Sequence, residues 1–268
     1  MKIVLTAGFN NSKTAYAIGE SLRKKGADIQ AVAIVSPFSF TRIKNTFAKN
    51  NFFDIVGLVK KLFNKKQTSS SERKFYQSNN IQFSSLNSWA CKHGIKVVNI
   101  KSLNEAKFER FLIENSIDGI IYGGGGILRK NIITLVEGRI INFHSGPLPE
   151  IRGMNAIEWS LLLGKELCST IHLIDQGIDT GRIISRVSLD LRKVNTIHDL
   201  KDAAFYQCLQ YFLDNYEIAS LDNLFKSIFN QIPSSRNNIE RQCYKMSKVI
   251  LELTKNKLDK LNENKGPD

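Results

Sequence analysis

The sequence predicts an α/β protein with a mostly parallel, twisted sheet. Apolar, β-branched runs alternate along the chain with segments of helical periodicity, and four consecutive glycines follow one of the apolar runs. The chain is 268 residues long and 42% hydrophobic, which is enough for a substantial core. It has no apolar run near the roughly 20 residues that a membrane-spanning helix needs.

The first part of the chain alternates strands with helices. Strands are expected at 2–6, 29–35, 96–100, 117–122 and 139–143, and helices at 14–25, around 85–94, at 103–115 and near Asn131. Ser12 is placed to cap the first helix and Gly26 to end it. This order implies parallel strands joined by right-handed crossovers, and therefore a Rossmann-like domain over residues 1–190. The turn AGFNNS after the first strand lacks GxGxxG, so no dinucleotide is inferred.

The rest of the chain predicts mainly helices. A helix is expected at 155–166, and residues 169–186 form two strands that the turn DQGIDTG separates. One long helix at 194–219, opened by Asn195 or Thr196, should pack on the first domain. A short helix after Leu221, a polar linker at 231–238 and a basic helix at 245–261 follow. We therefore expect a helical C-terminal extension over 191–262 and a disordered tail at 263–268.

The net charge of +13 is concentrated in one segment. Residues 37–80 form a basic insertion that supplies +7 of the excess. Within it, residues 52–66 have an apolar stripe flanked by lysines. Packing of this amphipathic helix on its own domain is favoured, and peripheral contact with an anionic membrane, or contact with nucleic acid, are the alternatives. Residues 67–74 are expected to form a mobile loop.

The four cysteines are far apart and form no CxxC pair. The N-terminus passes directly into a strand and shows no signal peptide. Reduced thiols in a cytoplasmic protein are therefore expected. No set of His, Cys and carboxylate residues has the sequence spacing of metal ligands, so no metal is predicted.

The stretch INFHSGPLPEIRG marks the predicted site. Asn142 and His144 are two residues apart at the end of a strand, so both side chains point to the same side at the edge where α/β sheets bind ligands. Asp175 and Asp179 lie on a loop that follows His172. An amide, an imidazole and a carboxylate can together stabilise an oxyanion and move a proton. Turn-forming roles for Asn142 and Asp179 are the alternatives, and His172 is favoured as a hydrogen-bonded structural histidine.

NFHSGPLPEIRG, a helix with an aromatic residue and HLIDQGIDTGRII resemble the formyltransferases that use 10-formyltetrahydrofolate. Those enzymes share an N-x-H loop ending in LP and RG, and the resemblance covers about residues 80–190. It implies the formyltransferase fold and matches Asn142, His144 and Asp179 to the catalytic residues. Asp179 should also raise the pKa of His144 if the two approach. The resemblance implies that the pterin is held by the backbone of Gly126, Ile127 and Leu128 and of Asp175, Gln176, Gly177 and Ile178. The glycines are equally suited to close packing of helix and strand.

The acceptor prediction depends on a few residues. The loop reads HSGPLP at 144–149 where the tRNA and purine enzymes usually read HPSLLP, and it looks more like family members that formylate nucleotide-linked amino sugars. Such a small-molecule amine, used in surface polysaccharide synthesis, is the favoured acceptor. Methionyl-tRNA, another small amine, and a non-catalytic membrane-associated protein with this fold are the alternatives. The C-terminal part looks too short for the β-barrel of the tRNA enzymes.

Arg152 and Gly153 are expected to contact substrate, although Arg152 also fits a solvated loop arginine. A homodimer is left open.

Overall fold

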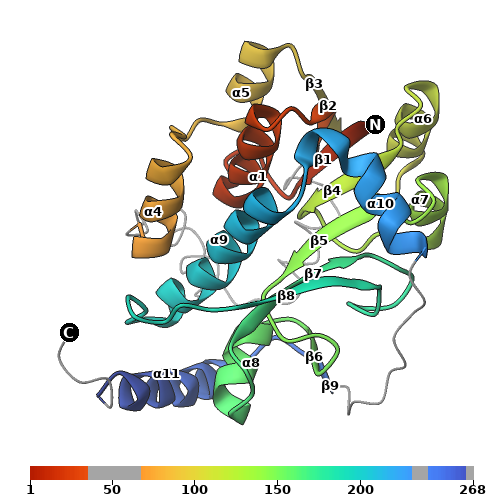
Figure 1. The fold of residues 1–268 in the computed structure, drawn as a ribbon. Helices are drawn as coiled ribbons and strands as arrows, with labels where there is room; N and C mark the ends of the chain where they lie inside the picture. The colour runs from red at the N-terminus through yellow and green to blue at the C-terminus, as the bar shows by residue number, and fades with distance from the viewer. Residues whose placement is uncertain (36–67, 231–240, 264–268) are drawn as a thin grey trace, which may run out of the picture.

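The computed structural model describes residues 1–35, 68–230 and 241–263 (Figure 1). The predicted amphipathic helix at 52–66 therefore lies outside the described residues. The predicted linker at 231–238 and residues 264–268 of the predicted tail also lie outside them.

One sheet of seven strands forms the centre of the described part, in the order β3-β2-β1-β4-β5-β7-β8. β1 to β5 are parallel, whereas β7 runs antiparallel to β5 and β8 antiparallel to β7. β7 lies beside β5, and a loop connects it to β8 at the edge of the sheet. Because these two pairings are antiparallel, the sheet is mostly but not wholly parallel. The strands are β1 (Lys2–Ala7), β2 (Asp28–Val35), β3 (Lys96–Ile100), β4 (Gly119–Gly123), β5 (Ile140–His144), β7 (Cys168–Leu173) and β8 (Ile183–Ser188).

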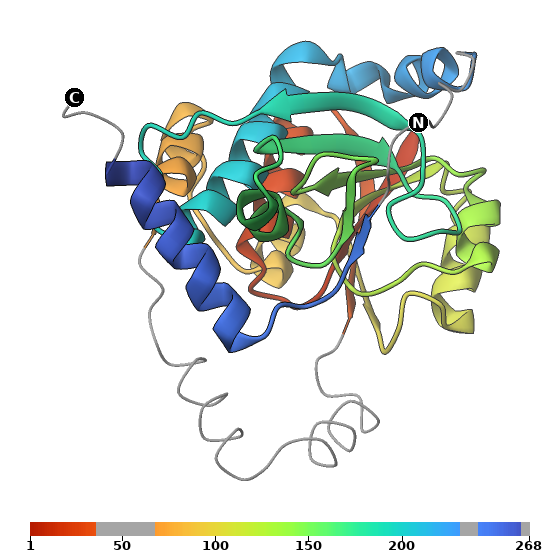
Figure 2. The same cartoon turned by 90° about the horizontal axis from the view of Figure 1, so that it is seen from below.

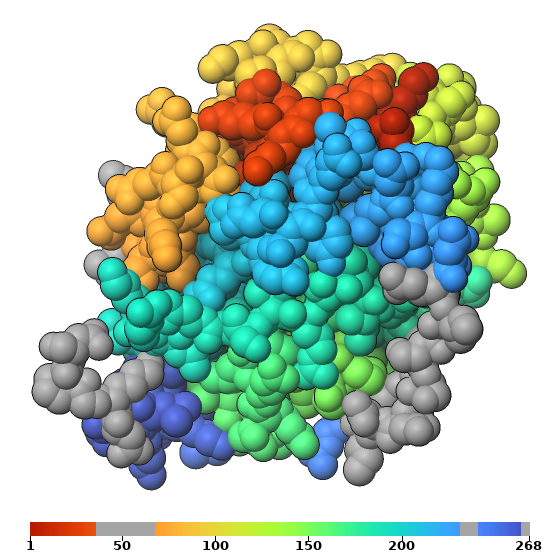
Figure 3. All heavy atoms as spheres, in the orientation of Figure 1, coloured from red at the N-terminus to blue at the C-terminus, as the bar shows by residue number. Residues whose placement is uncertain are grey.

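Helices cover both faces of this sheet. Successive side chains of a strand point to opposite faces, and both sets are buried. Ile3 and Leu5 of β1 belong to a core shared with α1, α4, α5, α9 and α10, while Val4 belongs to a second core with α6 and α7. Figures 1 and 3 show α9 and α10 lying over the first face, with α4 at its edge. The helices are α1 (Lys13–Lys24), α4 (Ser70–Ser78), α5 (Leu86–His93), α6 (Ala106–Glu114), α7 (Lys130–Leu135), α8 (Ala156–Leu163), α9 (Ile197–Asn215), α10 (Leu221–Asn230) and α11 (Lys248–Glu263), with a 3-10 turn, η1 (Ile218–Ser220), before α10.

Local signals explain where several helices begin. Ser12 Oγ accepts a hydrogen bond from Ala15 N at the start of α1, as its cap position predicts. Thr196, rather than Asn195, caps α9, and it forms a capping box with Asp199. Side chains of α9 then pack in the first core with those of β1 and β5.

The predicted mobile loop at 67–74 is wrong for most of its length. Ser70–Ser78 form α4, and Ser69 Oγ accepts from Glu72 N at 3.1 Å. The Ser-x-x-Glu spacing of Ser69 and Glu72 is a helix-start signal that the serine-rich composition obscured. Lys13 on α1 pairs with the buried Glu72 at 2.6 Å, and this contact fixes α4 against the sheet domain.

A second, two-stranded sheet was not predicted. β6 (Ile151–Gly153) pairs in parallel with β9 (Arg241–Cys243), although the two strands are far apart in sequence. The extension predicted as helical over 191–262 therefore contains a strand, and α11 reaches Glu263, which was assigned to the disordered tail. Figure 1 shows β9 and α11 below the main sheet, and Figure 2, which is seen from below, shows them on the near side.

None of the described helices is both long enough and apolar enough to cross a membrane.

Candidate active site

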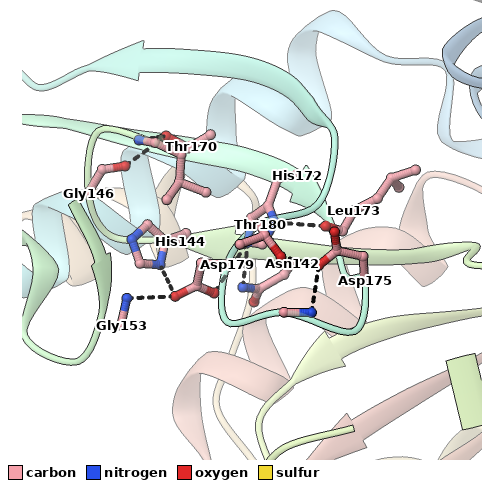
Figure 4. Close-up of polar contacts among 12 residues, drawn as sticks. Asn142, His144, Gly146, Gly153, Thr170, His172, Leu173, Asp175, Asp179 and Thr180 are labelled. Atoms are coloured by element: carbon pink, nitrogen blue, oxygen red, sulfur yellow. Dashed lines mark hydrogen bonds and ion pairs between the residues drawn. The ribbon is translucent and has the colours of Figure 1, made fainter. Parts of the chain in front are cut away.

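β5 and β7 bring the first two polar side chains of the site face to face. In the antiparallel register of these strands Asn142 is directly opposite His172 (Figure 4). His172 Nδ1 lies 2.8 Å from the carbonyl oxygen of Leu173, which can only accept, so Nδ1 carries the proton. His172 Nε2 therefore accepts a hydrogen bond from Asn142 Nδ2 at 2.9 Å. This contact fixes the amide of Asn142 and leaves its second N–H to point elsewhere.

His144 is oriented in the same way from the end of β5. Its Nε2 donates to the carbonyl oxygen of Ile151 at 3.0 Å, so Nδ1 of the neutral ring is an acceptor. Nδ1 lies 3.4 Å from Asp179 Oδ2, and His172 Nε2 lies 3.7 Å from Asp179 Oδ1 (Figure 4). In the neutral state, lone pairs of two imidazoles and a carboxylate therefore converge. Such a cluster is suited to receive a proton or an N–H donor.

Asp179 is held in this position by backbone geometry. It lies on the loop between β7 and β8 with φ at +51°, a left-handed conformation that Asp adopts more readily than most residues. The backbone N–H of Gly153 donates to Asp179 Oδ2 at 2.8 Å. Gly153, which was predicted to contact substrate, thus contacts the predicted catalytic carboxylate.

Burial dominates the electrostatics of the two histidines. His144 is buried, and loss of solvation holds its pKa below 6.5, while Asp179 and the hydrogen bond to Ile151 act in the opposite direction. Burial, followed by the neighbouring His144, lowers the pKa of His172 to about 4. Asp179 therefore raises the pKa of His144, as expected on approach, but burial outweighs it. Both rings are neutral near pH 7. The lone pair of His144 Nδ1 can accept a proton there, whereas that of His172 Nε2 accepts the hydrogen bond from Asn142.

The convergence of these side chains also bears on metal binding. His144, His172 and Asp179 offer ligand atoms that all lie within 4.8 Å of one another. Sequence spacing did not reveal this cluster, because the three residues come from different strands and a loop. However, the His172 Nε2 lone pair that a metal would need already accepts from Asn142 Nδ2. The arrangement fits proton transfer better than a metal centre.

The loop holding Ser145 to Glu150 is fixed by Thr170 on β7. Thr170 Oγ1 donates to the carbonyl oxygen of Gly146 at 2.7 Å and accepts from Leu148 N at 3.1 Å (Figure 4). Thr170 lies opposite His144 in the register of β5 and β7. Its two hydrogen bonds therefore hold the loop close to His144.

The predicted pterin segment, Gly126 to Leu128, lies beyond the end of β4. Gly124, Gly125 and Gly126 all have positive φ, between +108° and +122°, which explains why glycine is needed there. Tyr122 Oη donates to the carbonyl oxygen of Gly126 at 3.0 Å, and Tyr122 pairs with Asn142 in the register of β4 and β5. The segment is thereby connected to the catalytic strand.

Asn104 clamps the same segment from the loop before α6. Its Nδ2 donates to the carbonyl oxygen of Ile127 at 2.7 Å, and its Oδ1 accepts from Arg129 N at 2.7 Å. Ile127 itself is 73% exposed, while Leu128 is buried. The backbone is thus held in place while the apolar side chain of Ile127 is exposed to solvent. Nothing in the sequence around Asn104 signalled this role.

The second predicted pterin segment is organised by Asp175. Asp175 Oδ1 accepts from Gly177 N at 3.1 Å and from Thr180 Oγ1 at 2.5 Å, and these bonds close the turn (Figure 4). Gln176, Gly177 and Ile178 are exposed on it. Each of the two segments thus exposes an apolar side chain, Ile127 or Ile178, beside hydrogen-bonded backbone. Arg152, predicted to contact substrate, is partly buried on β6 opposite Gln242.

Comparisons with known proteins identify the family of the chain. Residues 1–207 match the formyl transferase family, so the chain belongs to that family. Methionyl-tRNA formyltransferase of Caldanaerobacter subterraneus subsp. tengcongensis is 34% identical over 125 residues, which are 44% of this chain and 40% of the relative. The match thus spans about two fifths of the length of that relative.

Two solved structures show the same fold. Phosphoribosylglycinamide formyltransferase of Bacillus halodurans superposes with a TM-score of 0.55 at 17% identity, over 86% of this chain and 100% of that one. A sugar N-formyltransferase of a Shewanella species superposes with a TM-score of 0.57 at 12% identity, over 96% of this chain and 87% of that one. The predicted α/β formyltransferase fold with a mostly parallel sheet is therefore confirmed.

Proposed function

We propose that this protein transfers a formyl group from 10-formyltetrahydrofolate to the primary amine of a nucleotide-linked amino sugar. The observation that carries the transfer chemistry is the contact set of Asn142, His144, His172 and Asp179 at the ends of β5 and β7. These side chains supply a fixed amide donor beside a group of proton acceptors.

Asp179 and His144 take the proton that the attacking amine must lose. Asp179 Oδ2 and the unprotonated Nδ1 of His144 are 3.4 Å apart, so a proton taken by either one is shared with the other as a charged hydrogen bond. As the carbon–nitrogen bond to the acceptor forms and the bond to N10 of the folate breaks, this proton passes to N10. Protons balance, and no external base is consumed.

Asn142 is placed to stabilise the negative charge that develops on the formyl oxygen. The formyl oxygen gains negative charge during attack, and the amide N–H that does not bind His172 can donate to it. The imidazolium formed when His144 takes a proton adds positive charge at the same stage. His172 never needs to titrate in this scheme, since its role is to hold the amide of Asn142 in one orientation.

The formyl donor is a co-substrate whose site fits two segments. We propose that the clamped backbone of Gly126 to Leu128 and the turn of Asp175 to Ile178 hold its pterin. Both segments start from strands that also carry site residues, namely β4 and β7. The reactive carbon of a donor held there reaches the edge at which Asn142 and Asp179 lie.

Two features support an amino sugar as the acceptor. The HSGPLP loop at 144–149 resembles that of enzymes acting on such sugars. The fold match to the sugar N-formyltransferase extends over 96% of this chain, against 86% for the phosphoribosylglycinamide enzyme. The C-terminal β9 lies beside the site through its pairing with β6, where an acceptor would be selected.

Methionyl-tRNA is the second candidate acceptor. The curated relatives reported as methionyl-tRNA formyltransferases include one at 34% identity and another, from Finegoldia magna, at 30% over half of this chain. The net charge of +13 also favours a polyanion.

The deciding experiment is a formyl-transfer assay with several acceptors. The protein is incubated with 10-formyltetrahydrofolate and, separately, with a panel of nucleotide-linked amino sugars, methionyl-tRNA and glycinamide ribonucleotide, and mass spectrometry detects the formylated product. We expect a formylated nucleotide sugar and a loss of at least about 10² in turnover in Asn142→Ala. Formylation of methionyl-tRNA alone would instead establish the second candidate.

A further inference from the structure

The small sheet of β6 and β9 has two unlike faces. On one face Ile151 and Cys243 are buried with Ala156 and the partly buried Trp159. Arg152 and Gln242, which alternate with them, lie on the other face. Directly after the two strands, Met154 is 58% exposed and Tyr244 is 72% exposed. A thioether and an aromatic ring are thus presented to solvent at one end of this sheet.

This end of the sheet borders the catalytic carboxylate. Gly153 pairs with Cys243 of β9 on one side, and its N–H donates to Asp179 Oδ2 at 2.8 Å on the other. The next residue, Met154, donates its N–H to the carbonyl oxygen of Cys243 at 3.1 Å. Only a single strand therefore separates β9 from Asp179.

The backbone that carries the exposed ring is held in place. Trp159 Nε1 donates to the carbonyl oxygen of Tyr244 at 2.9 Å, and Met246 N donates to Asn155 Oδ1 at 3.2 Å. At Gly153, with φ at +94°, a Cβ would collide with the carbonyl oxygen of Cys243, so the two strands approach too closely for any side chain. A large exposed ring on a fixed backbone loses little conformational entropy on binding.

We propose that Met154 and Tyr244 form the platform for the nucleobase of a nucleoside diphosphate-linked acceptor. The exposed Arg241 and Lys245 lie on either side of Tyr244 in the sequence and supply positive charge for the phosphates. Aromatic rings stack with any base because each base has a π-face. Of these residues, Met154 lies within residues 1–207, which match the family, whereas Arg241, Tyr244 and Lys245 lie outside them. This inference rests on the proposed function in placing the acceptor amine at Asp179.

The test uses uridine diphosphate and thymidine diphosphate alone as probes, titrated into the folded protein. Tyr244→Ala removes the ring but keeps the carbonyl group that Trp159 binds, and Tyr244→Phe keeps the ring. Phe229→Ala is the matched control, because Phe229 is also an exposed aromatic residue (44%) but lies on α10. We expect the Kd of the diphosphates to rise about 10-fold or more in Tyr244→Ala only. The KM of the nucleotide-linked sugar should rise similarly, with kcat and folate affinity close to those of the wild type.

Unchanged diphosphate affinity in Tyr244→Ala, or an equal loss in Phe229→Ala, would overturn the platform. Diphosphate binding requires no formyl transfer, so the two proposals can fail separately. Tyr244-dependent binding without formylation of any nucleotide-linked sugar supports the platform and refutes the proposed acceptor. Formylation with a KM that does not respond to Tyr244→Ala refutes the platform and supports the proposed function.

Discussion

At the scale of single residues, hydrogen bonds orient the side chains of the proposed site. The carbonyl groups of Ile151 and Leu173 determine which nitrogen of His144 and of His172 carries the proton. These carbonyls belong to ordinary apolar residues, so the sequence gives no sign of them. Asn142, His144 and Asp179 could be proposed from sequence because their types and spacing resemble a known family, whereas the contact between Asn142 and His172 required the register of β5 and β7.

The first residue-scale prediction concerns Asp179. Asp179→Asn keeps an oxygen that can accept from Gly153 N, so the loop and the folate affinity should persist. Turnover should nevertheless fall by about 10² to 10⁴, because an amide cannot take up a proton. Single-turnover formyl transfer and folate affinity are measured side by side. Asp175→Ala is the control, since it removes the oxygen that accepts from Gly177 N and Thr180 Oγ1, and it should weaken folate binding more than the chemical step. Normal formyl transfer by the saturated Asp179→Asn protein would contradict the mechanism.

The second residue-scale prediction concerns pH and stability. The pKa of His172 is about 4 in the folded protein against 6.5 for a free histidine, and burial also lowers the pKa of His144. Between these pH values the unfolded chain binds more protons than the folded one, so the free energy of unfolding falls as pH decreases from 6.5 toward 4. Urea unfolding at about pH 7 and about pH 5 measures this loss. In His172→Gln the difference between the two pH values should shrink, and an undiminished difference would count against the burial argument.

At the scale of elements, sequence patterns predicted those structures whose signal is local. Apolar β-branched runs predicted β1 to β5, and a cap predicted the start of α1. The patterns failed for β6 and β9, which have three residues each and pair across a long sequence separation. A strand that short has no measurable alternation, and its partner is determined by tertiary packing. The strand β5, which carries Asn142 and His144, was therefore predictable, while the strand that holds Gly153 beside Asp179 was not.

Substitution of Asn104 tests whether the backbone of Gly126 to Leu128 must be fixed before folate binds. Asn104→Ala removes both hydrogen bonds that clamp Ile127 and Arg129, so the backbone of Gly126 to Leu128 should become mobile. We expect folate affinity to fall about 30-fold, since two hydrogen bonds of about 1 kcal/mol each support the bound conformation. The rate at saturating folate should stay near that of the wild type. Asn131→Ala is the control, because its amide binds only the exposed side chain of Glu109 among the contacts given by the structure. Equal affinities in all three proteins would show that the clamp does not contribute.

At the scale of the whole molecule, the main sheet and the small sheet contribute different parts of the proposed site. Strands β4, β5 and β7 carry or lead into the proposed donor segments and the proposed catalytic side chains, and β6, which pairs with β9, contacts Asp179 through Gly153 N. The chain thus brings its C-terminal segment back to the site after α9 and α10 have covered the main sheet (Figure 1). Under the proposed acceptor site, this return would give a domain of the family its own acceptor preference.

The last prediction concerns the net charge of +13 and the tRNA alternative. A strongly basic protein binds any RNA through its phosphates, and such binding weakens steeply with added salt, because releasing counterions into a more concentrated solution gains less entropy. We therefore expect gel shifts with charged and uncharged tRNA to be equal, and both to weaken by about 10³ or more between about 50 mM and 200 mM salt. Formylation of the nucleotide-linked sugar should persist at the higher salt, because stacking and the fixed hydrogen bonds of the site are screened far less. Methionyl-tRNA bound in clear preference to uncharged tRNA at the higher salt, and formylated there, would show that the charge serves a specific RNA substrate and that the sugar proposal is wrong.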